Sequence, residues 1–385
     1  MRRAILCIAL AATALTPVLE AQEPAQGSRF PRRYLFSLLG AALGTAVGGS
    51  YIAFQGQQQP GNCGDPSCVV AVTVIAGSLI GYMIGREFDD LHALRYRGGA
   101  PLDPRSISAG LSGDATVLSV EDDRVAVGGS AGVQMFRSTP SALRADGRRA
   151  AGVRGIAALD LAQPGALALG SVTGLYLFPP TQGPGTLVRP GEIGATVTTV
   201  DRVFLGGGSM VESAPLSADT SRLWPGVDVG ARVRDLEVDL ARNILWALTD
   251  SAVVTLRIAG DSLEKLAAFP LVQGRALALE QNRIAVALGE QGVMMFDATD
   301  LTALRQTGAW AGARFAYDLS LAGARLFVAA GPEGLYVLEV SGGELRVLGL
   351  ARELGFTVAV ASFGSFTYVL DRSTNSVRRI ESEFQ

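Results

Sequence analysis

The chain has 385 residues, of which 48% are hydrophobic and 18% charged, so it can bury a large core. Its net charge of −3 gives it no general attraction for polyanions, and we predict no nucleic-acid partner. His92 is the only histidine and lies ahead of the repeats described below, which excludes histidine-based triads and histidine-rich metal sites from those repeats.

The N-terminus of the chain has the features of a secretory signal peptide. Two arginines follow Met1, an apolar run covers residues 4–15, and the small residue Ala21 suits cleavage. Cys7 lies inside this run, too early for a lipoprotein cysteine. An uncleaved signal anchor is the alternative. We predict a signal peptide over residues 1–21, followed by a short linker over residues 22–33.

Two uncharged apolar stretches follow, at 34–54 and 68–85. Each is long enough to cross a hydrocarbon core of about 30 Å. Four-residue glycine spacing, which lets two helices approach closely, occurs at Gly40, Gly44, Gly48, Gly77, Gly81 and Gly85. The pair resembles glycine-zipper segments of bacterial envelope proteins. We therefore predict an α-helical membrane hairpin over 34–85, in contact with the lipid bilayer and able to form homo-oligomers through its glycine faces. Two buried helices of a soluble domain are the alternative.

Two signals disagree about the orientation of this hairpin. An export signal followed by two spans returns the rest of the chain to the exported side. The loop at 55–67 has no Lys or Arg, however, and the positive-inside rule would place the arginine-rich flanks in the cytoplasm. We give the export signal more weight because long domains translocate largely regardless of charge. The same loop contains Cys63 and is followed directly by Cys68, for which a disulfide, free thiols or, least of all, a metal pair are the alternatives.

After a juxtamembrane linker at 86–104, the chain repeats one pattern at a regular spacing. Each copy has a short apolar strand, a polar turn, a second apolar strand, a glycine turn, a third strand and a looser fourth. A strand-rich period of about 40 residues is typical of a β-propeller, in which each copy forms a four-stranded blade. We predict an all-β, seven-bladed propeller over residues 105–385. The first strands begin near Val117, Ile156, Val197, Leu236, Leu277, Leu319 and Val358.

The glycine turn is clearest at residues 289–296 and 331–338. These copies resemble the LVIVD-type propeller repeat, and Asp297 occupies the acidic position that follows the third strand in that family. The resemblance implies the fold and no activity, because propellers host unrelated functions. The fourth copy replaces the glycines with residues 250–252 and the seventh with residues 373–376. No Trp-Asp pair ends a strand, which argues against the WD40 subtype.

The ends of the repeat region predict how the ring closes. The seventh copy ends after its third strand, at residues 377–380, and has no fourth. Residues 105–112, ahead of the first copy, stand where a fourth strand stands elsewhere. We predict that they form the outer strand of the seventh blade, which removes open sheet edges. An eighth, degenerate blade is the alternative, but no residues are left to build it.

Two sets of polar residues recur near the first strands. Asp160, Asp235, Asp239 and Asp318 could line a central funnel, and we interpret them as structural turn residues, with Asp160 and Asp239 at equivalent positions. Arginine recurs at the entries to first strands, at Arg154, Arg234, Arg275 and Arg314. If these entries share one face, the arginines could bind an anionic ligand or an acidic partner. Solvated loop charges paired with neighbouring acids are the alternative.

The sequence therefore favours a non-catalytic propeller that serves as a protein-interaction platform in the bacterial cell envelope. We expect it to be anchored in the membrane with the propeller on the periplasmic side, and to bind envelope proteins that the sequence does not identify. We assign no catalytic, cofactor-binding or metal-binding residue. The alternative is a propeller hydrolase or lyase with a carboxylate and calcium site in the central funnel.

Overall fold

The computed structural model describes residues 100–101, 106–162, 165–180, 183–216, 225–341 and 344–381. The predicted signal peptide, the apolar stretches at 34–54 and 68–85 with their glycines, and Cys63 and Cys68 lie outside these ranges. Within the described ranges, no helix has the length and apolar character needed to cross a membrane. The prediction of a membrane hairpin is therefore not tested by the structure.

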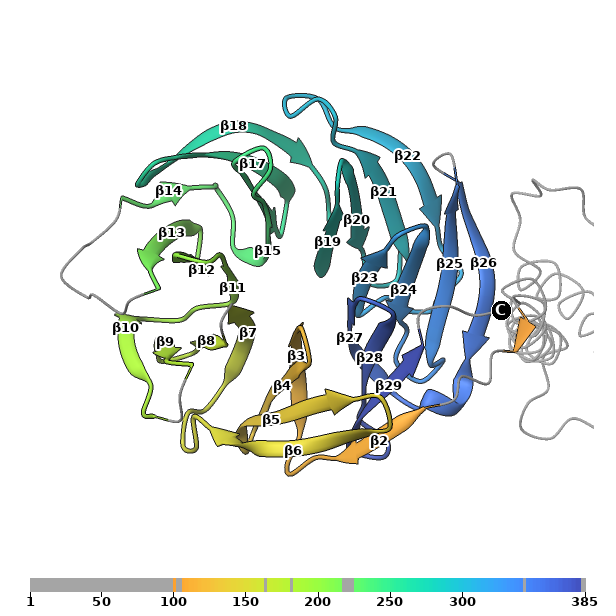
Figure 1. Ribbon diagram of the computed structural model, residues 1–385. Coiled ribbons are helices and arrows are strands. Elements are labelled where there is room, and N and C mark those ends of the chain that lie inside the picture. The colour runs from red at the N-terminus through yellow and green to blue at the C-terminus, as the bar shows by residue number, and fades with distance from the viewer. Residues whose placement is uncertain are drawn as a thin grey trace, which may run out of the picture. The chain divides into compact units, whose positions relative to one another are not determined.

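Seven four-stranded antiparallel sheets are arranged as blades around a common axis, with the first strand of each blade innermost (Figure 1). This confirms the predicted seven-bladed propeller. Blade I consists of β3 (Ala115–Glu121), β4 (Arg124–Gly129), β5 (Gly132–Thr139) and β6 (Ala142–Arg149), and blade II of β7 (Ile156–Ala162), β8 (Ala166–Ser171), β9 (Gly174–Phe178) and β10 (Thr186–Pro190). Blade III consists of β11 (Ala195–Thr198), β12 (Arg202–Gly207), β13 (Met210–Pro215) and β14 (Val227–Asp228), and blade IV of β15 (Val233–Asp239), β16 (Ile244–Thr249), β17 (Ala252–Ala259) and β18 (Ser262–Pro270). Blade V consists of β19 (Ala276–Glu280), β20 (Arg283–Ala287), β21 (Val293–Asp297) and β22 (Arg305–Trp310), and blade VI of β23 (Asp318–Ala322), β24 (Arg325–Ala329), β25 (Leu335–Ser341) and β26 (Glu344–Ala351). Blade VII consists of β27 (Thr357–Phe363), β28 (Phe366–Asp371), β29 (Ser376–Glu381) and β2 (Ile107–Gly110).

The hydrophobic core lies between the blades. All residues of β8 and β16 are buried, as expected for strands whose two faces are both covered by neighbouring blades. The largest core cluster joins side chains of blades V and VI, and another joins blades III and IV. The outer strands are more open, and most residues of β6 are exposed. Continuous apolar sequences thus form the second strands and mixed sequences form the outer ones.

The hairpins between second and third strands are built in two ways. In blades V and VI, Gly289 and Gly331 both have a φ of +58°, which favours glycine. In blade IV the Thr249 hydroxyl instead accepts hydrogen bonds from the Ser251 and Ala252 N–H groups. In blade VII the Asp371 carboxylate accepts the corresponding hydrogen bond, from the Ser373 N–H. Polar capping explains why the fourth and seventh copies manage without the glycine pattern.

The ring closes as predicted. β2 pairs antiparallel with β29, from Ile107 opposite Arg379 to Gly110 opposite Ser376, and completes blade VII as its outer strand. The Leu111 N–H donates to the Asn375 carbonyl at 2.8 Å, and the Asn375 side-chain amide donates to the Leu111 carbonyl at 3.0 Å. The two ends of the repeat region are therefore held together by a sheet edge and its flanking turn.

A buried arginine provides a second closure that the sequence did not indicate. Arg379 of β29 is 3% exposed, and its guanidinium donates to the Ser138 hydroxyl and the Pro140 carbonyl, both at 2.7 Å, and to the Thr139 carbonyl. The Phe366 ring centroid lies 4.3 Å from its Cζ atom. Blade VII is thus joined to the outer turn of blade I.

β1 (Ala100–Pro101) was also not predicted. It pairs parallel with β26 as a fifth strand of blade VI, with Ala100 opposite Gly349 and Pro101 opposite Leu350. The sheet therefore includes residues that precede the predicted start of the propeller at residue 105.

Candidate functional site

The four predicted arginines all lie where a connection enters a first strand. In an antiparallel blade this edge also carries the hairpin between the second and third strands, and we call it the connection face. Arg234 pairs with Asp250 at 2.5 Å, and Arg314 pairs with Glu333 at 3.6 Å. Arg154 is exposed and has no hydrogen bond or ion pair to the described residues. Two of the four are thus neutralised by neighbouring acids, as the alternative interpretation expects.

Arg275 differs because its partner is an aromatic ring. Its guanidinium carbon lies 5.5 Å from the Phe315 ring centroid, within the range of a cation–π contact. Phe315 packs against Tyr317 at 4.5 Å between centroids, and Tyr317 packs edge-on against Phe356 at 5.8 Å. We call Phe315, Tyr317 and Phe356 the aromatic row. All three side chains are partly exposed, so the row forms part of the connection face across blades VI and VII, with Arg275 of blade V at one end.

Glycine hairpins make room for two of these rings. A Cβ atom added at Gly289 would lie 3.0 Å from the Phe315 ring, and one added at Gly331 would lie 2.6 Å from the Tyr317 ring. The hairpin of blade V therefore supports Phe315, and that of blade VI supports Tyr317. The glycines that mark the repeat in the sequence serve both the turn and the packing of the row.

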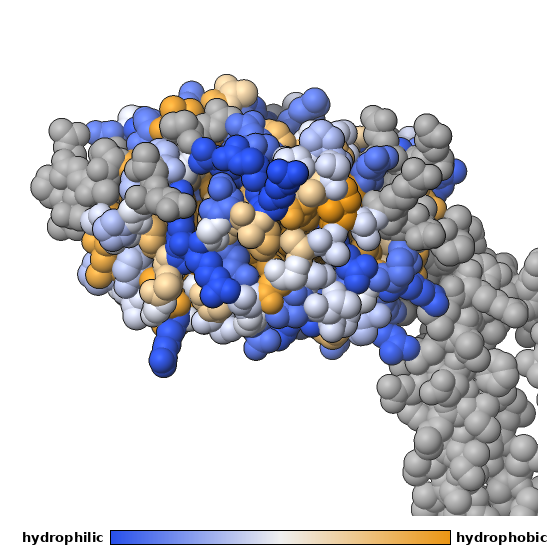
Figure 2. Space-filling view, turned by 60° about the horizontal axis from the view of Figure 1, so that its bottom comes forward, coloured by the Kyte–Doolittle hydropathy of each residue, from blue (hydrophilic) through white to orange (hydrophobic). Residues whose placement is uncertain are grey.

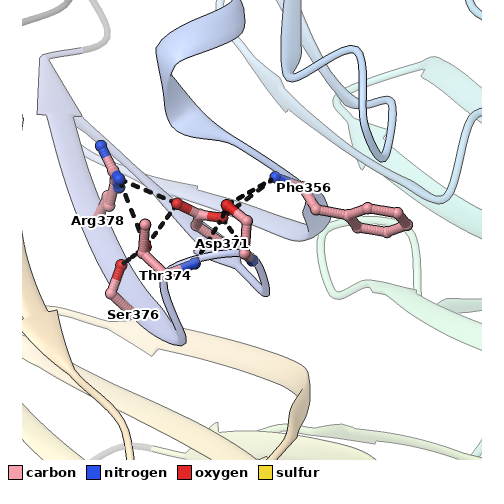
Figure 3. A network of polar contacts seen from close by, with 6 residues as sticks. Phe356, Asp371, Thr374, Ser376 and Arg378 are labelled. Carbon is pink, nitrogen blue, oxygen red and sulfur yellow. Dashed lines mark hydrogen bonds and ion pairs between the residues drawn. The ribbon is translucent and has the colours of Figure 1, made fainter.

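Phe356 is positioned by the carboxylate of Asp371, which is 1% exposed. The Phe356 N–H donates to Oδ1 at 3.1 Å, and Figure 3 shows the ring pointing away from the carboxylate. The same carboxylate accepts hydrogen bonds from the Ser373 and Thr374 hydroxyls. It also forms an ion pair with Arg378 at 3.0 Å. Burial opposes ionisation of Asp371, but these hydrogen bonds and the Arg378 charge outweigh it and lower its pKa. The backbone at Phe356 is therefore fixed by a charged, fully bonded group.

Sequence reasoning missed the aromatic row. The feature of the sequence that could have revealed it is the spacing of Phe315 and Phe356. They shortly precede the first strands of the sixth and seventh copies, so they stand one repeat apart. Matching backbone bonds confirm that the positions correspond, since the next residue in each case, Ala316 or Thr357, bonds to the hairpin glycine of the preceding blade.

The inner-strand aspartates join neighbouring blades. Asp235 of blade IV accepts the Leu277 N–H of blade V at 2.7 Å, and Asp318 of blade VI accepts the Val360 N–H of blade VII at 2.8 Å. Asp160 of blade II accepts the Thr198 N–H of blade III at 2.6 Å. Because the first strand of each blade is an edge strand, some of its N–H groups have no ladder partner. The three carboxylates satisfy such groups.

This arrangement corrects two sequence interpretations. Asp160, Asp235 and Asp318 lie on strands, and of the four predicted turn residues only Asp239 caps a turn, accepting the Arg242 N–H at 3.1 Å. Asp160 pairs with the third residue of β8, and Glu237 with the third residue of β16, so these two positions correspond. Asp239 is therefore not the counterpart of Asp160.

Desolvation raises the pKa of these carboxyl groups, to about 6 for Asp160 and Asp318 and about 7 for Asp235. Each of the three residues is only partly exposed. Glu237 has its pKa raised well above the ordinary value by burial and then by the charges of Asp235, Asp160 and Asp318. Within the described ranges, no three His, Cys, Asp or Glu side chains are placed to hold a metal ion.

No family model and no curated protein matches the chain. Solved structures do: one described as the structure of U3-55K has 11% identity and a TM-score of 0.60, covering 74% of this chain and 100% of that one. The WD40 domain of Neurospora crassa Pan2 has 12% identity and a TM-score of 0.55, covering 74% and 98%. The WD40 propeller of Doa1 has 15% identity and a TM-score of 0.54, covering 72% and 97%. At these identities the likeness shows the fold alone, and the resemblance to the LVIVD repeat stays a prediction. The described part of the chain is a seven-bladed β-propeller with the fold of WD40 domains.

Proposed function

We propose that the propeller is a non-catalytic platform that binds another protein through its connection face. The observation that carries this proposal is the aromatic row, whose rings remain partly exposed although hairpin glycines and Asp371 hold them in place. Rigid, partly exposed aromatic side chains beside arginine are the groups that contribute most to binding at protein interfaces. WD40 domains among the similar folds are compatible with this role.

The rest of the described surface has no stronger candidate. Large hydrophobic side chains are exposed singly, at Val172, Leu187, Val200, Leu240, Val272 and Phe363. On the side shown in Figure 2, hydrophobic residues lie in small groups among hydrophilic ones. Scattered apolar side chains of this kind are normal for a protein surface.

We further propose that the platform is anchored in the bacterial cell envelope. The support is the sequence alone: the export signal at 1–21 and the uncharged, glycine-patterned stretches within 34–85. In this arrangement the propeller lies on the periplasmic side and binds envelope proteins. Protease digestion of permeabilised and intact cells tests it, and a propeller protected in permeabilised envelopes would reverse the orientation.

The hydrolase or lyase alternative has less support. It needs inner-strand carboxylates free to bind calcium, whereas Asp160, Asp235 and Asp318 each accept backbone N–H groups of the next blade. Calcium that bound only the folded state would raise the melting temperature, and the rise would grow with the logarithm of the calcium concentration above the dissociation constant. We expect no rise, and a clear rise would favour the alternative.

Site-specific photo-crosslinking tests the platform. A photoreactive amino acid at Val272, which is 66% exposed three residues before Arg275, should give an adduct of one defined mass in cells. Leu187, which is 43% exposed on the outer strand of blade II, is the matched control and should give none. Identical adducts at both positions, or none at Val272, would refute binding through the connection face.

A further inference from the structure

We propose that the aromatic row and its two flanking arginines bind an extended peptide segment in which proline or aromatic side chains lie between carboxylates. The proposal rests on the platform function and names the chemistry of the partner. It requires three properties of the site: an open apolar strip, positive charge at both ends, and a geometry fixed before binding.

The strip is continuous. The Arg275 guanidinium, Phe315, Tyr317 and Phe356 follow one another at 5.5, 4.5 and 5.8 Å. The rings are tilted or edge-on to one another, at 48° and 61° between ring planes, and present apolar surface that suits flat, stiff side chains. Proline-rich segments meet this requirement because they are already extended and lose little conformational entropy when they dock on aromatic side chains.

An exposed arginine belongs to each end of the strip. The Arg275 guanidinium lies beside the Phe315 ring, and the backbone of Arg372 lies beside that of Phe356, since the Arg372 N–H donates to the Phe356 carbonyl at 2.8 Å. Both are exposed, and neither has an ion-pair partner among the described residues. Guanidinium groups bind carboxylates through paired hydrogen bonds, so acidic residues on both sides of the apolar segment would complement these ends.

The remaining charges nearby do not cancel this pattern. Glu333 is committed to Arg314, whose N–H also donates to it at 2.9 Å. Glu290 and Glu353 are exposed on neighbouring loops, and Arg352 is exposed beside Glu353. No ion pair joins these glutamates to Arg275 or Arg372 in the described structure. The two arginine ends therefore keep positive charge available to a ligand.

The row is fixed before a ligand arrives. Phe315 and Tyr317 lie so close to Gly289 and Gly331 that a Cβ atom there would meet the rings, and Asp371 holds the Phe356 backbone. A site that is already ordered loses less entropy on binding. This explains why a nearly fully buried carboxylate, with its desolvation cost, is used beside a partly exposed ring.

The test measures peptide binding to the purified full-length chain by fluorescence anisotropy. The probe is a labelled decapeptide of repeating glutamate-proline-proline units, compared with a lysine-proline-proline peptide and a glutamate-glycine-glycine peptide. We expect the first to bind about tenfold more tightly than either of the others, the ratio that one well-formed charged or apolar contact contributes. Equal binding of the three peptides, or none of the first, would overturn the proposal.

Matched variants locate the site. Arg275→Glu should weaken binding of the acidic proline peptide by about tenfold or more, because it removes one charged contact and adds repulsion. Arg154→Glu is the control, since Arg154 is exposed at the same kind of entry but lies outside the row. An equal loss in both variants would mean general charge attraction and would refute the site.

Hydrogen exchange gives a readout without any substitution. The bound peptide should slow exchange at residues 311–317 and 352–356 and leave the blade I to III connections unchanged. Protection elsewhere on the propeller would contradict the assignment. If peptide binding fails while the Val272 adduct persists and is unaltered by Arg275→Glu, the platform stands and the aromatic row is not its binding site.

Discussion

Blades II and VII build the same connection with different consequences. In both, the residue after the second strand donates its N–H to the carbonyl just before the first strand: Val172 to Gly155 at 3.2 Å, and Arg372 to Phe356 at 2.8 Å. The last residue of the second strand caps the hairpin in both, as Ser171 in blade II and Asp371 in blade VII. The repeat thus determines the backbone, and the side chains at these positions differ between blades.

The difference lies in the reach of the capping group. Among the described residues, the Ser171 hydroxyl bonds within its own hairpin alone, to Thr173 and Gly174. The longer Asp371 carboxylate bonds its hairpin and also reaches the Phe356 N–H of the incoming connection. Blade VII therefore adds a bond that orients an aromatic residue where blade II has glycine. A position that varies between otherwise equal repeats is the place to look for function.

Replacing Asp371 gives the largest effect we expect. Asp371→Ala leaves the Arg378 charge and several donors without an acceptor, and should lower the free energy of unfolding by about 3–4 kcal/mol. Asp371→Ser restores the hairpin cap seen in blade II but leaves Arg378 without its ion pair, so it should cost less than Asp371→Ala and still weaken peptide binding through the released Phe356. Urea unfolding measures the first effect. A loss of under about 1 kcal/mol in Asp371→Ala would show that the network contributes little.

Blade VII also differs from the other blades because its buried Arg379 joins it to blade I and so helps to close the ring. Arg379→Met keeps an apolar contact with Phe366 but removes the hydrogen bonds to Ser138, Thr139 and Pro140. We expect a loss of about 2–3 kcal/mol in urea unfolding, because three part-buried hydrogen bonds from a charged donor are lost. Arg144→Met, on the exposed outer strand of blade I, should change stability by less than about 0.5 kcal/mol. Equal effects of the two variants would contradict the second closure.

The sequence was sufficient for the architecture because the repeat acts through local chemistry. Apolar strands separated by short turns recur in each copy, and the missing fourth strand of the seventh copy required the segment that became β2. The strands begin within three residues of the positions that marked them in the sequence, the largest difference being Val233 for Leu236. Counted from the observed starts of β7 and β15, the residue four places on is Asp160 in one strand and Glu237 in the other.

The site could not be predicted in the same way because its contacts run between copies. Phe315 meets Arg275, and Phe356 meets Tyr317, only after the blades are packed side by side. The single repeated feature that spacing did reveal, the arginines, is divided by the structure into different environments. Arg234 and Arg314 are paired, Arg275 faces a ring, and Arg154 is exposed. The repeat spacing identified the four arginines as candidates, and the packing of the blades gave them different partners.

Two kinds of buried carboxyl predict how stability depends on pH. Desolvation raises the pKa of Asp235 from 3.8 to about 7, so the folded state binds more protons than the unfolded state between these values. That contribution is present below pH 4 and is lost as the pH rises through 7. For Asp371, whose pKa is lowered, the contribution is present above the ordinary value and is lost as the pH falls.

We therefore expect the free energy of unfolding to fall by about 1–2 kcal/mol between pH 5 and pH 8, a value reduced to allow for partial solvent access. Asp160→Asn should flatten the profile, since its amide could donate to Ser119 and still accept from Thr198. Urea unfolding at the two pH values checks both. Stability that rises toward pH 8 would show that the inner-strand carboxyls are ionised without cost.

The smallest effect concerns the glycines beneath the rings. Gly331 and Gly208 have φ values of +58° and +56°, but an added Cβ meets the Tyr317 ring at 2.6 Å in the first case and nothing within 4 Å in the second. Alanine at either position should cost about 1 kcal/mol for the left-handed backbone, and Gly331→Ala should cost about 1 kcal/mol more because the ring must move. Urea unfolding of the two variants isolates the cost of moving the Tyr317 ring, since the backbone cost is the same in both. Equal losses would mean that Tyr317 moves aside without resistance, and a row whose middle ring moves freely would not be fixed before binding.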